Sequence, residues 1–96
     1  MIVKRKLKIK NAQGLHARPA SMFVKIANKY EAEVSVRKGA EVVNGKSIMG
    51  LMTLAAIQGS MLEIEATGPD AEKAVEELEQ FLTSDIDEDK TKPGAA

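Results

Sequence analysis

His16 is the residue of this chain whose chemistry stands out most clearly. It is the single histidine among 96 residues, and Arg18 and Pro19 follow it closely. Imidazole is largely neutral near pH 7, so its nitrogen lone pair can act as a nucleophile without a separate activating base. A lone histidine is more often an ordinary surface or core residue, so its neighbours must decide its role.

The neighbours of His16 favour the acceptance of an anionic group. Beyond Pro19, apolar residues recur with the helical period, at Ala20, Phe23, Val24 and Ala27. Because proline is tolerated only in a first turn, we expect this helix to begin at about His16 or Ala17. Its first N–H groups would lack helical partners and could bind an anion on the imidazole, as could the Arg18 guanidinium. No carboxylate is evident nearby in the sequence, which favours group transfer over hydrolysis.

The hydrophobic pattern predicts the elements that would position these residues. Alternating apolar and polar residues predict half-buried strands at residues 3–9, 32–37, 41–43 and 61–66. Helical periods follow Ser47 and Asp70, which we expect to be N-cap residues, and predict helices at 48–55 and 71–82. Arg5 is the one residue that breaks the alternation of the first strand.

The order of these elements predicts the fold class. The order β-α-β-β-α-β-α, without an internal repeat, is typical of an α+β open-faced sandwich. We expect a four-stranded, mainly antiparallel sheet with three helices on one face and the other face open to water. Residues 1–83 would form this single domain. Residues 84–96 are acidic and end in Lys-Pro-Gly-Ala-Ala, so we expect a disordered acidic tail.

Composition removes several classes of function. The chain has no cysteine, so thiolate metal sites and cysteine nucleophiles are excluded, and one histidine excludes a site with two imidazoles. We therefore expect no metal and no other cofactor. Three aromatic residues leave little for stacking nucleic-acid bases, and no stretch has the apolar length of a signal peptide or a membrane span. These features predict a cytoplasmic protein that neither binds nucleic acid nor inserts into a membrane.

The charges are divided unevenly along the chain, although they sum to zero. Residues 1–48 contain eleven basic and three acidic residues, whereas residues 49–96 contain three basic and eleven acidic ones. A surface built mainly from the first half would attract an anionic partner, provided that the fold gathers these charges on one face. The alternative is a charged face that is simply solvated.

Two motifs, taken together, resemble the HPr family of phosphocarrier proteins. They are GLHARPA at residues 14–20 and VNGKSIMGLM at residues 43–52, in the order and at the distance found in that family. The resemblance covers residues 1 to about 83. The tail is the main departure, because members of the family usually end soon after the last helix.

The resemblance implies roles for several residues. His16 matches the histidine that enzyme I of the phosphoenolpyruvate-dependent phosphotransferase system phosphorylates on Nδ1, before the group passes to a histidine of an A-type enzyme II component. Arg18 matches the arginine that attends this phosphate. Ser47 matches the serine that receives a regulatory phosphate in organisms with an HPr kinase. The chain would then be a monomeric carrier and not itself an enzyme.

The short helix after Ser47 carries the expected docking residues. Periodicity alone favours a core position for Met52, whereas the resemblance implies an exposed apolar patch beside the histidine. On that basis Ile48, Met49 and Met52 are contact candidates, and Leu51 is expected to point inward.

Two alternative functions are also compatible with the sequence. The chain could be mainly a regulatory protein, in which phosphorylated Ser47 controls binding to a transcription regulator. The presence of His16 favours carriage, because the histidine can be replaced in regulatory relatives. An anion- or RNA-binding module finds little support, because the lysines are scattered and lack stacking aromatics.

Overall fold

The computed structural model describes residues 1–10, 15–54 and 59–83, and seven elements lie within these ranges. The strands are β1 (Ile2–Lys8), β2 (Glu33–Lys38), β3 (Glu41–Asn44) and β4 (Met61–Thr67). The helices are α1 (Ala17–Ala27), α2 (Ile48–Thr53) and α3 (Ala71–Thr83). The predicted order of elements is confirmed. Helix α2 ends at Thr53, with Leu54 as its C-cap, so the predicted extension of this helix to Ala55 is wrong. The predicted turn at residues 11–14 and the tail 84–96 lie outside the described residues.

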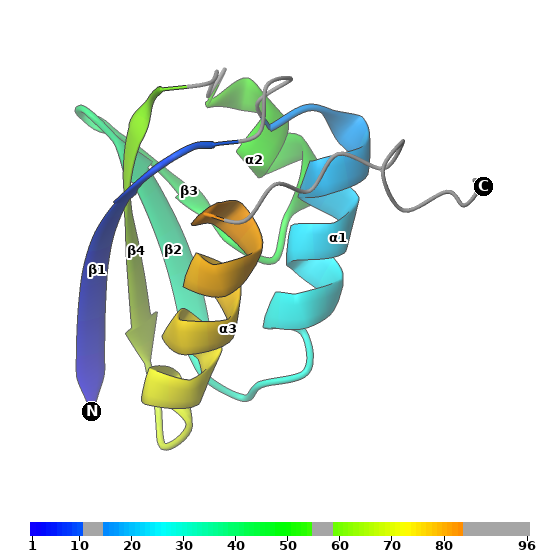
Figure 1. Cartoon of the computed structure of the whole chain (residues 1–96). Coiled ribbons are helices and arrows are strands. Elements are labelled where there is room, and N and C mark those ends of the chain that lie inside the picture. The colour runs from blue at the N-terminus through cyan, green and yellow to red at the C-terminus, as the bar shows by residue number, and fades with distance from the viewer. Residues whose placement is uncertain (11–14, 55–58, 84–96) are drawn as a thin grey trace, which may run out of the picture.

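The four strands form one sheet in the order β1-β4-β2-β3 (Figure 1). Each pair of neighbouring strands is antiparallel. Strands β2 and β3 are joined by a two-residue turn, in which Gly39 has a φ of 62°, a conformation that favours glycine. The expected mainly antiparallel sheet is therefore confirmed.

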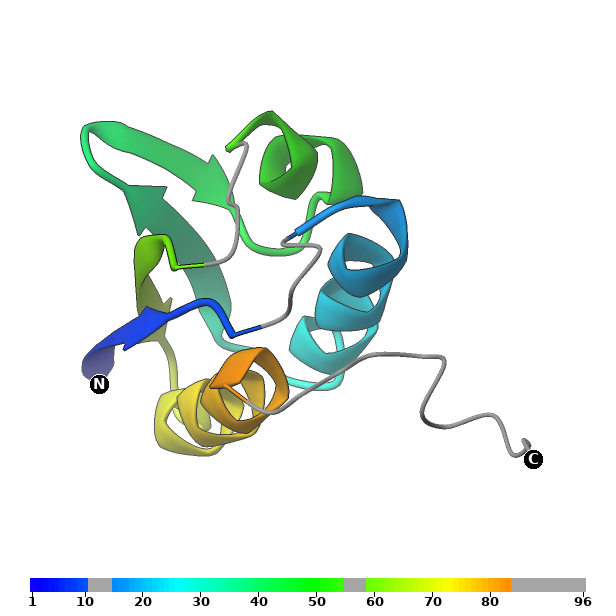
Figure 2. The same cartoon turned by 45° about the horizontal axis from the view of Figure 1, so that its top comes forward.

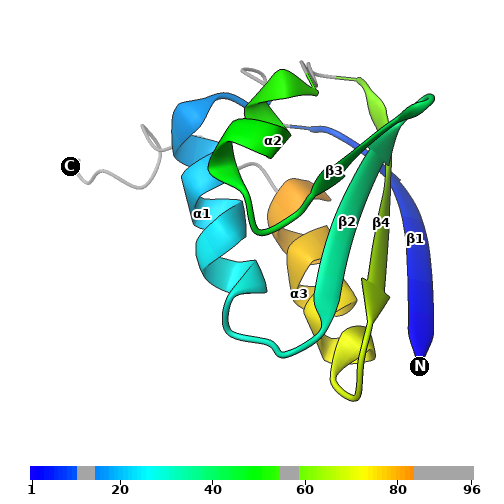
Figure 3. The ribbon, with the colours of Figure 1, turned by 180° about the vertical axis from the view of Figure 1, so that it is seen from behind.

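All three helices cover the same face of the sheet (Figures 1 and 3). Helix α3 packs on β1 and β4, and α1 packs against both α3 and α2. Seen from above, the sheet forms one layer and the helices form the other (Figure 2). The structure is thus the predicted open-faced α+β sandwich.

The core lies between these two layers and follows the apolar periods of the sequence. On α1 the buried face comprises Pro19, Ala20, Phe23, Val24 and Ala27. On α3 it comprises Ala71, Ala74, Val75, Leu78 and Leu82. Full burial of one large apolar side chain stabilises the fold by about 1.5 to 3 kcal/mol. The two amphipathic helices are therefore held by burial of these faces and need little intrinsic helix stability of their own.

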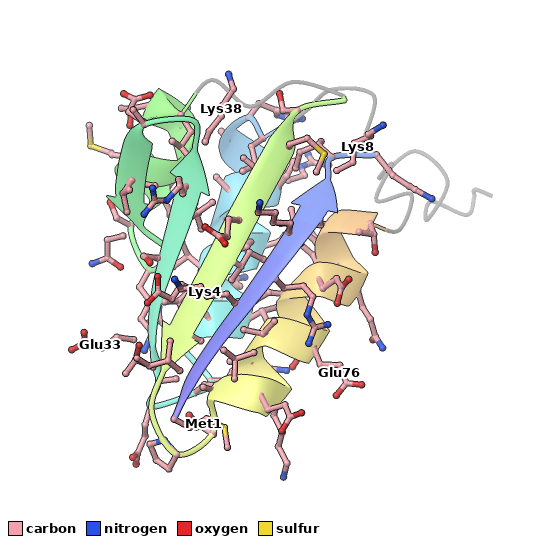
Figure 4. All side chains as sticks on the ribbon, turned by 90° about the vertical axis from the view of Figure 1, so that its left-hand side faces the viewer. Met1, Lys4, Lys8, Glu33, Lys38 and Glu76 are labelled. Carbon is pink, nitrogen blue, oxygen red and sulfur yellow. The ribbon has the colours of Figure 1, made fainter. Side chains whose placement is uncertain are left out.

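The uncovered face of the sheet mixes the charges of the two halves of the chain (Figure 4). Lys4 lies opposite Glu65 and Lys6 lies opposite Glu63 in the register of β1 and β4. From β2, Arg37 Nε lies 3.7 Å from Glu63 Oε1. Because strand pairing sets basic residues of the first half beside acidic residues of the second, this face is a mixed, solvated surface and not a basic one.

Arg5, the exception to the alternation of β1, has a structural explanation. Its side chain is half-buried on the helical side of the sheet and forms an ion pair with Glu79 of α3. An arginine can bury its aliphatic stem while its guanidinium stays near solvent. Arg5 therefore adds a polar contact to the packing of α3 on β1.

Asp70 stands at the start of α3 but uses its side chain elsewhere. Its carbonyl oxygen accepts the hydrogen bond of Ala74 N–H at 3.1 Å, which makes it the first residue of the helical ladder. Its carboxylate accepts hydrogen bonds from the N–H groups of Glu31 and Ala32, both at 2.9 Å. These bonds lower the pKa of Asp70, mainly through Glu31. Asp70 therefore occupies the predicted N-cap position by its backbone, and its carboxylate also ties the α1–β2 connection to α3.

Candidate functional site

Helix α1 begins at Ala17, the second of the two starting positions that the sequence predicted. His16 is its N-cap, with an extended backbone (φ −95°, ψ −165°), and its carbonyl accepts the N–H of Ala20 at 2.9 Å. Its side chain makes no capping hydrogen bond, and the first turn contains no acidic residue. Within residues 1–10, 15–54 and 59–83, the start of α1 therefore lacks the side-chain acceptor that usually occupies a helix start.

Two backbone donors remain available at this helix start. The N–H groups of Ala17 and Arg18 lie in the first turn, and neither has a hydrogen-bond acceptor among the described residues. Pro19 is the third residue of the helix and has no N–H to offer. The proline thus fixes the first turn while adding no further unpaired donor, and it is itself buried.

The imidazole of His16 is half-buried, and its two nitrogens differ. The Nε2 atom is buried and has no hydrogen-bond partner within the part of the chain that the structure describes. A phosphoryl donor bound to a partner protein cannot reach a buried atom. Nε2 is therefore shielded from an external group, whereas Nδ1 is not among the buried, unpartnered polar atoms of the described residues.

Arg18 lies two residues from His16 in the same turn. Its side chain is exposed and forms no ion pair with any described residue. An unpaired guanidinium can give several charge-assisted hydrogen bonds to a phosphate. The cation predicted from the sequence therefore remains free to bind an anion near the helix start.

The two ends of α1 are held in different ways. Near the site, Leu15 and Phe23 are buried in the core. At the far end, Lys29 Nζ lies 2.6 Å from Glu77 Oε2, and the Tyr30 hydroxyl donates to the same carboxylate. These contacts lower the pKa of Glu77, with the bond from Lys29 the larger cause, and the bond to Glu77 raises the pKa of Tyr30 to about 12. The polar anchors are therefore remote from His16, whose end of the helix is fixed by packing.

Ser47 caps α2 as predicted. Its Oγ accepts the N–H of Gly50 at 3.0 Å, and its carbonyl accepts the N–H of Leu51 at 3.0 Å. A Cβ at Gly50 would lie 3.3 Å from both Ser47 Oγ and Val43 Cβ. Gly50 weakens the helix in isolation, but here it lets the capped turn approach β3 closely.

The turn before Ser47 contains contacts that the sequence did not predict. Gly45 N–H donates to Val34 O at 2.7 Å, and a Cβ on Gly45 would lie 2.5 Å from Val34 Cγ1. Lys46 Nζ donates to Tyr30 O at 2.9 Å. The Asn44-Gly45 pair signalled a turn, but no local pattern could reveal the contact of Lys46 with a residue 16 positions away.

Helix α2 divides into a buried and an exposed side. Leu51 is fully buried, as expected, whereas Ile48, Met49 and Met52 are exposed. The burial of Met52 that periodicity alone favours is therefore not observed. Helix α2 packs beside the beginning of α1 at the same end of the molecule (Figures 1 and 3). The exposed apolar patch and His16 consequently belong to one end of the fold.

Neither a metal cluster nor a membrane span occurs in the described residues. Within 1–10, 15–54 and 59–83, no three His, Cys, Asp or Glu side chains are grouped so that they could hold a metal ion. No helix in these same ranges has the length and apolar character needed to cross a membrane.

One protein family matches most of the chain. The sequence profile described as the PTS HPr component phosphorylation site spans residues 3–84. The chain belongs to the HPr family. HPr proteins are phosphocarriers and not catalytic enzymes, so this chain is a phosphocarrier of the phosphotransferase system. The family predicted from the two sequence motifs is confirmed.

Individual HPr relatives support this membership. The phosphocarrier protein HPr of Buchnera aphidicola subsp. Acyrthosiphon pisum is 43% identical over 77 residues, covering 80% of this chain and 91% of that protein. The crystal structure of HPr from Bacillus anthracis matches with a TM-score of 0.83 at 41% identity, covering 85% of this chain and 98% of that one. The four-stranded sheet with three helices is thus the HPr fold.

An HPr-like protein of another name is also similar. Crh of Bacillus subtilis is 38% identical over 85 residues, covering 88% of this chain and all of Crh. A crystal structure of Crh, with a TM-score of 0.69 at 40% identity, covers 83% of this chain and 92% of that one and is described as a dimer with a swapped domain. The chain therefore has relatives of both the HPr and the Crh type.

Proposed function

We propose that this chain accepts a phosphoryl group from phospho-enzyme I on His16 Nδ1 and passes it to a histidine of an A-type enzyme II component. The observation that carries this proposal is the open start of α1. His16 offers no capping bond there, and neither the two N–H groups of the first turn nor the Arg18 side chain has a partner in the part of the chain that the structure describes. Burial of Nε2 supports transfer at Nδ1.

The chemistry of phosphoryl transfer fits such a site. In the transfer, the Nδ1 lone pair forms a bond to phosphorus while the bond from phosphorus to the donor breaks and its electron pair stays with enzyme I. The transition state is loose and spreads charge over the three equatorial oxygens. The free N–H groups and the Arg18 guanidinium can stabilise that charge without further proton transfer. Because the imidazole is only half-buried, the group stays accessible to the next acceptor.

The exposed patch on α2 is the proposed docking surface for these partners. Ile48, Met49 and Met52 present apolar area next to the start of α1. Methionine side chains are flexible enough to fit several different partners. We propose that residues 1–83 act as one monomeric, cytoplasmic domain in this relay.

Ser47 is the proposed regulatory site. Its hydroxyl lies at a helix start, where the dipole and nearby N–H groups tolerate a phosphate of charge about −1.5 to −2. Ser47 directly precedes Ile48 of the docking patch. A phosphate there would place charge inside an apolar contact and would weaken docking while leaving the fold intact.

A second candidate function is mainly regulatory. The similarity to Crh favours it, because Crh is distinguished by name from the phosphocarriers. In that case an HPr kinase would phosphorylate Ser47, and the modified protein would bind a transcription regulator. His16 favours carriage, because the open helix start would have no purpose in a protein controlled at Ser47 alone.

Labelling tests the proposed function directly. The protein is incubated with phosphoenolpyruvate, magnesium and the cognate enzyme I, and the bound phosphate is mapped by mass spectrometry. We expect one phosphate on His16 that is labile in acid and stable in alkali. His16→Ala should abolish labelling.

The control for this test is the melting temperature of His16→Ala. The imidazole makes no capping bond, so the variant should melt close to the wild type. Persistent labelling of a folded His16→Ala protein would overturn the assignment. Labelling of neither protein by an active enzyme I would leave the regulatory function as the better proposal.

A further inference from the structure

We infer that Met49, followed by Met52, is an oxidation-sensitive modification site through which peroxides reversibly block docking to enzyme I. This inference rests on the proposed function, because it concerns regulation of the same apolar patch. The chain contains five methionines and no cysteine, so methionine is its only sulfur-containing side chain that peroxide can oxidise.

The exposed fractions of the two methionines of the patch predict which of them peroxide oxidises first. Met49 is 77% exposed, the largest value among the exposed large apolar side chains of the described residues, and Met52 is 44% exposed. Both lie on α2, where the burial of Leu51 directs their side of the helix toward solvent. A docking patch must stay exposed between encounters, so these sulfur atoms cannot be protected by burial without losing the surface itself.

The proposed reaction is a two-electron oxidation by hydrogen peroxide. The thioether sulfur attacks one peroxide oxygen, and a sulfur–oxygen bond forms while the oxygen–oxygen bond breaks. The proton on the transferred oxygen passes to the departing hydroxide. The products are methionine sulfoxide and water, and a methionine sulfoxide reductase can reverse the change.

Oxidation changes the patch from apolar to polar at its most exposed point. A sulfoxide is a strong hydrogen-bond acceptor, and its burial in an apolar contact without a donor is unfavourable. We therefore expect the apparent KM of enzyme I for the oxidised protein to rise about tenfold, with little change in kcat. The fold should be unaffected, because neither side chain is buried.

Met61 provides an internal control. It is 54% exposed, comparable with Met52, but it lies in β4 opposite Lys8 on the uncovered face of the sheet. That face is the one opposite the helical layer, which carries α2 (Figures 2 and 4). Oxidation of Met61 should therefore occur under the same conditions without affecting docking.

The experiment compares each protein with its own untreated sample. Wild type, the double variant Met49→Leu/Met52→Leu, and Met61→Leu are treated with hydrogen peroxide, mapped by mass spectrometry, and assayed for phosphorylation by enzyme I. We expect the KM to rise in wild type and in Met61→Leu but to stay constant in the double variant. Methionine sulfoxide reductases A and B should restore the wild-type KM.

Two results would overturn the inference. One is an unchanged KM for wild type whose Met49 is oxidised, and the other is an equal rise in KM for the double variant. Failure of the proposed function is distinct, because the untreated wild type would then take no phosphate on His16 from an active enzyme I.

Discussion

The starts of α1 and α2 differ in whether a side chain of the N-cap residue accepts a hydrogen bond from the N–H groups of the first turn. At α2, Ser47 Oγ accepts the N–H of Gly50 and fills the helix start from within the chain. At α1, the side chain of His16 accepts no such bond, and Pro19 occupies the third helical position, where it offers no donor. Helix α2 is thus stabilised by its cap, whereas α1 is held by its buried face.

The start of α2 is closed by its own N-cap, whereas the start of α1 has N–H groups that an external anion could bind. Two N–H groups of α1 stay unpaired among the described residues, and a phosphate attached to His16 could use them. A serine or aspartate in place of His16 would satisfy these donors and compete with that phosphate. Burial of Phe23 and its neighbours compensates for the missing cap.

Removal of the Arg18 guanidinium from the start of α1 should have the largest effect on the rate of phosphoryl transfer. Arg18→Ala should still accept phosphate on His16 but transfer it roughly ten- to a hundredfold more slowly, a loss of about 1.5 to 3 kcal/mol in transition-state stabilisation. Rapid-quench measurement of transfer from phospho-enzyme I gives the rate. Lys25→Ala is the matched control, because Lys25 is an exposed cation in the last turn of the same helix. A wild-type rate for Arg18→Ala would remove it from the mechanism, as would an equal loss for Lys25→Ala.

A negative charge at Ser47, the N-cap of α2, should have the next largest effect on phosphorylation by enzyme I. Ser47→Asp should raise the apparent KM of enzyme I roughly five- to tenfold, because a carboxylate beside Ile48 opposes apolar docking. The melting temperature should change little, because aspartate is also a good N-cap. Ser47→Asn is the control, since it caps without charge. Equal KM values for the three proteins would contradict a regulatory role for this position.

Removal of the Ser47 side chain should show how much the N-cap of α2 contributes to the stability of the fold. Ser47→Ala should lose about 1 kcal/mol of unfolding free energy, because the N–H of Gly50 loses its acceptor. His16→Ala should stay within about 0.5 kcal/mol of the wild type, because its ring caps nothing. Urea denaturation of both variants provides the comparison. Equal losses would mean that the two starts are structurally equivalent.

The smallest expected effect concerns Asp70, whose carboxylate binds two N–H groups outside its own helix. These bonds lower its pKa, so the ionised group stabilises the fold above the ordinary aspartate pKa of about 4. The contribution is lost as the pH falls through the lowered pKa, where the folded and unfolded carboxyl groups are both protonated. Asp70→Asn should melt below the wild type at pH 7, and the gap should narrow below pH 4. A gap that is constant with pH would show that charge at Asp70 is irrelevant to stability.

Local patterns predicted the elements and the main candidate site. Apolar periods gave the strands and helices, Pro19 indicated the start of α1, and Ser47 was identified as a cap. These features depend on neighbours within about four residues, and such distances are visible in a sequence. The two motifs around His16 and Ser47 also led to the correct family.

Contacts between distant residues required the tertiary structure. The partner of Arg5 lies 74 residues away in α3, and the carboxylate of Asp70 serves a connection 38 and 39 residues earlier. The apparent division of charge also vanished, because antiparallel pairing placed β1 beside β4. No local periodicity carries this information, because strand order is decided by which apolar faces can pack together.

The sequence by itself indicated where the helices begin and which serine caps α2, and it made His16 the candidate phosphoryl acceptor. Only the tertiary structure decided that Nε2 of His16 is buried and that Met52 faces solvent. The reason is physical. Residue type and spacing set the chemistry and the local backbone, whereas burial depends on how α1, α2 and the sheet pack, and that packing joins residues far apart in the chain.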